Sequence, residues 1–78
     1  MEEMYKGHKI VASTWQLAET GHYEPRVFVM WSEGPEHKHR PLVFTRSFSS
    51  EHDAELEGLK MARQWIDDGK PEVRVGPT

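Results

Sequence analysis

The sequence predicts an α+β protein in which a three-stranded antiparallel meander is followed by one amphipathic helix packed on one face of the sheet. Three segments rich in β-branched and aromatic residues come first, at about 8–17, 25–31 and 42–48. The segment at about 50–68 then repeats apolar residues at three- and four-residue spacing, which is the period of a helix. A length of 78 residues leaves room for one domain, spanning 1–78.

The strand at 25–31 is apolar on both of its faces, which is typical of a central strand with something covering each side. Its two parities are Val27, Val29 and Trp31 on one face, and Phe28 and Met30 on the other. A single helix covers only one side of a sheet, so the other side either stays exposed or meets a partner. We therefore predict a protein interface that includes Trp15, Val27, Val29 and Trp31.

The segment 32–41 contains two prolines and one glycine among charged residues. This composition predicts a long connection between the second and third strands rather than a strand of its own. Near the C-terminus, residues 72–75 alternate in polarity, which leaves open a short fourth strand.

The helix begins after Ser50, a good N-cap residue, and acidic residues follow in its first turn. Trp65 falls in the apolar stripe, so we expect it in the core. Arg63 and Asp67 have the spacing of an i,i+4 ion pair on the helix surface.

Composition excludes several classes of protein. The chain has no cysteine, which removes disulfides, Cys-based zinc sites and a Cys nucleophile, and no apolar run is long enough to cross a bilayer. The N-terminus has no signal-peptide pattern, so we expect a cytoplasmic protein. No catalytic or phosphate-binding motif is present. We therefore predict no enzymatic activity and no cofactor.

Two features of the segment 37–46 suggest ligands. His37 and His39 stand two residues apart, but they supply only half of a metal site, so we predict no bound metal. Lys38, Arg40 and Arg46 form the only basic concentration in the chain and are the candidate contacts to nucleic acid.

Two local patterns resemble the partial sheet domain of HicB-type antitoxins. They are the Gly21-His22-Tyr23 step before the second strand and the Phe48-Ser49-Ser50-Glu51-His52-Asp53-Ala54 start of a helix that ends with Trp65-Ile66. The resemblance spans roughly residues 5–70 and implies the fold and a bacterial or phage origin. Residues 32–41 replace the Pro-Asp-x-Pro-Gly segment usual in that family, and no separate DNA-binding segment follows Gly69. The resemblance therefore carries over no functional residue.

The function that the sequence favours is a small cytoplasmic protein-interaction or accessory module without catalytic activity. Its expected partner is protein, with self-association favoured. The alternative is a nucleic-acid-associated regulator or antitoxin-like protein that uses the basic segment 37–46.

Overall fold

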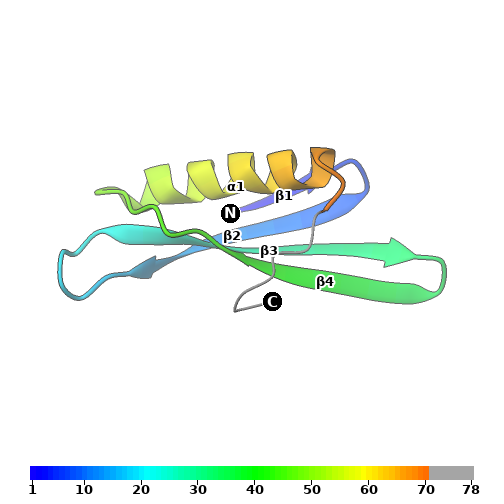
Figure 1. Cartoon of the computed structure of the whole chain (residues 1–78), viewed down its shortest axis with the longest axis horizontal. Coiled ribbons are helices and arrows are strands. Elements are labelled where there is room, and N and C mark those ends of the chain that lie inside the picture. The colour runs from blue at the N-terminus through cyan, green and yellow to red at the C-terminus, as the bar shows by residue number, and fades with distance from the viewer. Residues whose placement is uncertain (71–78) are drawn as a thin grey trace, which may run out of the picture.

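The computed structural model describes residues 1–70 and consists of an antiparallel sheet with one helix on it. The elements are β1 (Glu2–Tyr5), β2 (His8–Gln16), β3 (Tyr23–Glu33), β4 (Glu36–Val43) and α1 (Glu51–Asp67). The strands lie in the order β1-β2-β3-β4, and α1 packs on one face over β2 and β3 (Figure 1). The α+β class is confirmed, with four strands in this part of the chain. The short strand left open at 72–75 lies outside the described residues.

Tight turns connect the outer strands to the inner ones. Lys6 and Gly7 both have positive φ (46° and 77°), as a two-residue type I′ hairpin requires. Between β3 and β4, Gly34 has a φ of 59° and is followed by Pro35. A glycine at the first central position is the signature of the type II′ hairpin.

The prediction that 32–41 is a connection is wrong, because β4 begins at Glu36 directly after the Gly34-Pro35 turn. This strand lies at the sheet edge, where charged side chains are common and deter pairing with other chains. Proline is tolerated on an edge strand, so Pro41 does not interrupt it.

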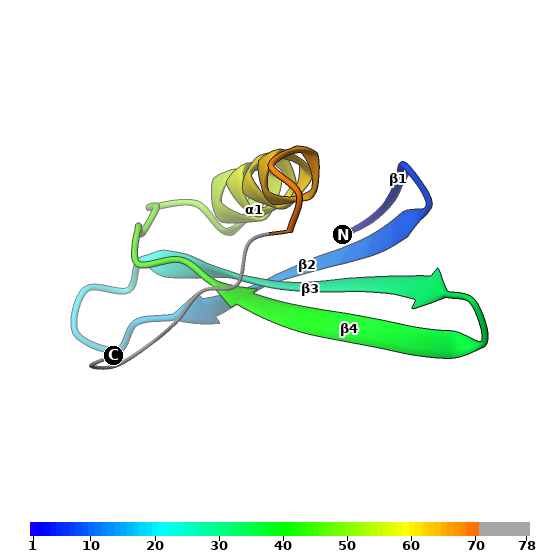
Figure 2. The same cartoon turned by 45° about the vertical axis from the view of Figure 1, so that its right-hand side comes forward.

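The predicted strand at 42–48 is also wrong beyond Val43, where β4 ends. The chain then leaves the sheet to reach the start of α1 in the other layer (Figure 2). One backbone pairing with the sheet occurs in this segment. Tyr23 and Phe48 exchange two backbone hydrogen bonds, of 2.7 and 2.8 Å.

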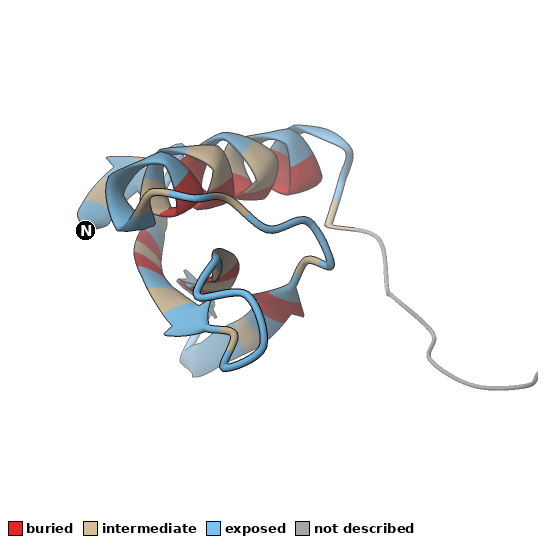
Figure 3. Ribbon diagram, turned by 90° about the vertical axis from the view of Figure 1, so that its left-hand side faces the viewer, coloured by how far each residue is buried: buried red, intermediate tan, exposed pale blue. Residues whose placement is uncertain are grey.

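The core lies between α1 and the inner strands, where the buried side of the helix faces the sheet (Figure 3). The sheet contributes Ile10, Ala12, Val27, Val29 and Leu42, and the helix contributes Leu59, Ala62, Trp65 and Ile66. Trp65 is buried, as predicted, and its ring meets that of Trp31 edge-on at 6.1 Å. The helix sits close to the sheet at Gly58, where an added Cβ would lie 3.0 Å from Cγ2 of Val27.

Side chains of the first hairpin fasten β1 to the helix. The Arg63 guanidinium donates to both carboxylate oxygens of Glu3, at 2.8 and 2.7 Å. The Tyr5 hydroxyl and the Lys6 ammonium both donate to Asp67, at 2.8 and 2.6 Å. These bonds hold the pKa of Asp67 below its usual value, and Asp67 raises the pKa of Lys6. Arg63 and Asp67 therefore contact β1 and its turn, instead of forming the ion pair predicted from their spacing.

Ser50 caps α1 as predicted, because its side-chain oxygen accepts a hydrogen bond from the backbone N–H of Asp53 at 3.3 Å. We expect Ser50→Ala to lower the free energy of unfolding by about 1 kcal/mol through loss of this cap. Chemical denaturation of Ser50→Ala beside Ser49→Ala measures the effect. A loss at Ser49 with none at Ser50 would place the cap one residue earlier.

Truncation of Trp65 tests the core. We expect Trp65→Ala to lower the free energy of unfolding by about 3–5 kcal/mol, because removing a buried indole leaves a cavity. Leu56→Ala is the matched control on the same helix, since Leu56 is exposed. Equal denaturation midpoints for the two variants would contradict a core role for Trp65.

Candidate interaction surface

The face of the sheet opposite α1 is the candidate site, because no element in residues 1–70 packs on it (Figures 1 and 2). The pairing register places its side chains in rows across the strands. One row consists of Met4, Lys9, Met30 and His39, and the next of Glu2, Val11, Phe28 and Pro41. A third row contains Ser13, Arg26 and Val43, and Trp15 pairs with Glu24 beyond it. We call this surface the open face.

Large apolar side chains on the open face are unusually exposed. Their exposed fractions are Met4 69%, Trp15 60%, Val43 59%, Phe28 49% and Met30 37%. Taking about 150–250 Å² for a fully exposed large side chain, these five leave on the order of 500 Å² of apolar surface in water. A patch of this size lies toward the upper end of those found on monomeric proteins and is often functional.

The charged side chains of the open face are paired with one another. The Lys9 ammonium lies 3.2 Å from a Glu2 carboxylate oxygen, and the Arg26 guanidinium lies 3.1 Å from Glu24. The Arg26 guanidinium also lies over the Trp15 ring, 5.7 Å from its centroid. Both cations therefore have an anionic neighbour within the chain, and the face presents apolar groups with balanced charge.

The four predicted interface residues do not share one surface. Trp15 lies on the open face, but Val27 and Val29 are buried beneath α1. Trp31, of the same parity, is half-buried and donates its indole N–H to Glu33 at 2.7 Å. The prediction is therefore wrong for Val27 and Val29, because α1 covers their parity of β3 rather than the other.

Sequence reasoning missed the open-face residues Phe28, Met30, Met4 and Val43. The signal for Phe28 and Met30 was present, since they form the second apolar parity of β3. Nothing in that alternation indicates which parity the helix covers. Met4 and Val43 were missed because β1 and the true end of β4 were not predicted.

The three predicted nucleic-acid contacts are spread over the other side of the sheet and its margin. Lys38 and Arg40 lie on β4 on the parity that pairs with Trp31 and Val29, the side of the helix. Lys38 lies 3.7 Å from Glu33 and 3.9 Å from Glu36. Arg46 follows β4 and lies 3.6 Å from Glu57 of α1. Acidic neighbours thus accompany Lys38 and Arg46.

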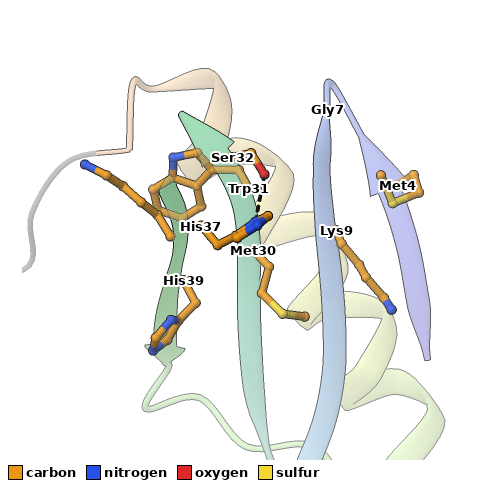
Figure 4. A pocket seen from close by; sticks show the side chains of 9 residues that line it. Met4, Gly7, Lys9, Met30, Trp31, Ser32, His37 and His39 are labelled. Atoms are coloured by element: carbon orange, nitrogen blue, oxygen red, sulfur yellow. Dashed lines mark hydrogen bonds between the residues drawn. The ribbon is translucent and has the colours of Figure 1, made fainter. Parts of the chain in front are cut away.

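A shallow concavity of about 450 Å³ lies at one end of the open face (Figure 4). Its lining is Met4, Gly7, Lys9, Met30, Trp31, Ser32, His37, Lys38 and His39. His37 Nδ1 and the Ser32 hydroxyl form a hydrogen bond of 3.1 Å. Within residues 1–70 no three His, Asp or Glu side chains gather as a metal-binding group.

Comparison with protein-family models, with curated proteins and with solved structures found no match to this chain. No helix in the described part of the chain is long and apolar enough to cross a membrane. The physical character of the open face is therefore the basis for the functional argument.

The His37–His39 pair makes a prediction about zinc. We expect equimolar zinc to leave the melting temperature unchanged, because two imidazoles provide half of the ligands that a structural zinc site needs. Calorimetric melts over a zinc titration measure this, since a bound native state is stabilised by RT ln(1 + [L]/Kd). A dose-dependent rise that His37→Ala and His39→Ala abolish would contradict the prediction.

Proposed function

We propose that this protein is a non-catalytic protein-interaction module that docks through the open face of its sheet, with a second copy of the chain as its partner. The observation that carries the proposal is the exposure of Trp15, Phe28, Met30, Met4 and Val43 together on one face. The lack of cysteine in the whole sequence supports a cytoplasmic setting.

The area of the open face supports docking of a protein rather than of a small molecule. A standard interface buries about 800 Å² on each partner, of which roughly 56–58% is non-polar. The apolar surface exposed here, on the order of 500 Å² by the same side-chain estimate, matches that non-polar share. The concavity at one end of the open face is shallow, whereas small-molecule sites bury most of their ligand.

Two features favour a second copy as the partner. The cations Lys9 and Arg26 already pair with Glu2 and Glu24, so an identical face can pack against this one without burying an uncompensated charge. A two-fold dimer uses the same patch on both subunits and is the commonest assembly of soluble proteins. Phe28, in the middle of β3, then lies near the centre of the interface.

The alternative function is a nucleic-acid-associated regulator or an antitoxin-like protein, the latter in keeping with the resemblance to HicB-type sheet domains. It rests on Lys38, Arg40 and Arg46, and the acidic neighbours of Lys38 and Arg46 weaken it. The two functions differ in their response to salt. Nucleic-acid binding falls steeply as salt rises because counterions are released, whereas apolar docking is nearly insensitive.

The test is the mass of the protein in solution. We expect light scattering over a dilution series to give a dimer at high concentration, and Phe28→Glu to give one chain throughout, because it places a charge at the centre of the apolar face. Leu56→Glu is the matched control, since Leu56 is similarly exposed (46%) but lies on α1. A wild-type mass of one chain at every concentration would refute self-association.

A further inference from the structure

The concavity on the open face combines two kinds of soft metal ligand that come from separate strands. Met4 is on β1, Met30 on β3, and His37 and His39 on β4, and all four line the concavity. Both thioethers reach solvent, with Met4 69% and Met30 37% exposed. Methionines often fill gaps in protein interiors, but Met4 and Met30 are too exposed for that role.

Strand register brings three of these ligands together. Met30 and His39 are direct partners across β3 and β4, a position in which Cβ atoms lie about 4.5–5.5 Å apart. His37 precedes His39 by two residues and so projects from the same face of β4. Figure 4 shows the His37 imidazole in front of β3, next to Ser32 and Met30. His39 lies further along β4, and its side chain is exposed.

Ser32 contacts one ring nitrogen of His37 and leaves the other, Nε2, for a ligand role. The Ser32 hydroxyl bonds to Nδ1 of His37 at 3.1 Å. In the tautomer whose Nδ1–H donates to that hydroxyl, Nε2 keeps its lone pair and faces away from Ser32. Such an outer hydrogen bond is the usual device for orienting a histidine ligand.

The donor set determines the class of metal. The lining contains no carboxylate, and its two cations are paired with carboxylates that lie outside it: Lys9 with Glu2 at 3.2 Å, and Lys38 with Glu33 at 3.7 Å. Neutral donors do not offset the charge of a hard divalent ion, and thioether sulfur favours monovalent copper. We propose that the open face binds Cu⁺ through Met30 Sδ, His37 Nε2 and His39, with Met4 at the margin of the site. Met4 and Met30 also belong to the apolar surface proposed for self-association, so the two proposals share residues and are tested by separate variants.

Silver(I) is the probe, because it shares the ligand preference of Cu⁺ and does not undergo redox chemistry in air. The full chain is titrated with Ag⁺ in chloride-free buffer, and NMR of the methionine ε-methyl groups monitors binding. We expect the titration to saturate at one equivalent. The Met30 resonance should shift while that of Met61, on α1, stays in place. Equal shifts at Met30 and Met61, or none at Met30, would overturn the proposal.

Variants separate the ligands from the residue that positions them. We expect Met30→Leu and His37→Gln each to weaken Ag⁺ binding by about tenfold or more, and Ser32→Ala to weaken it by about 10–100-fold. Met61→Leu is the matched control and should bind as the parent does. Unchanged affinity in both Met30→Leu and His37→Gln would refute the site. Trp15 lies on the open face but does not line the concavity. We therefore expect Trp15→Glu to disrupt self-association and to retain Ag⁺ binding. This variant distinguishes a failure of self-association from a failure of metal binding.

Discussion

The close approach of α1 to the centre of the sheet is the constraint on which the rest of the structure depends. It occurs at Gly58, where an added Cβ would lie 3.0 Å from Val27 and 3.4 Å from Pro25. A glycine at this point lets the helix backbone come close to β3, which in turn brings Trp65 down onto the sheet. The core is therefore a thin layer under one helix, as expected for a chain of 78 residues.

The face of the sheet that α1 covers determines which side chains of β3 are exposed on the other face. By covering Val27 and Val29, the helix turns the opposite parity of β3 outward and exposes Phe28 and Met30. Apolar side chains that would serve as a second core in a larger protein are here exposed to solvent. The ion pairs Lys9–Glu2 and Arg26–Glu24 balance charge around them, so the open face joins an exposed apolar patch to the methionine and histidine side chains that line the concavity at its end.

The helix was predictable because its signals are local. Ser50, the acidic first turn and the apolar stripe act within a few residues of one another, and each is found where the pattern placed it. The inner strands β2 and β3 were predictable for the same reason, since their side-chain composition favours extended backbone. The outer strands β1 and β4 could not be predicted from local composition. Both are rich in charged residues, and they are strands only because a tight turn returns the chain alongside an apolar neighbour.

The sequence alone determined the α+β class, the bounds of the helix and the two apolar parities of β3, because propensity, capping and periodicity are properties of neighbouring residues. The tertiary structure alone decided which parity became core, and with it whether Val27 or Phe28 is a surface residue. It also decided the partners of Arg63 and Asp67, which contact Glu3, Tyr5 and Lys6 of β1 and its turn instead of each other. These outcomes depend on packing between segments about 60 residues apart, which local patterns do not encode.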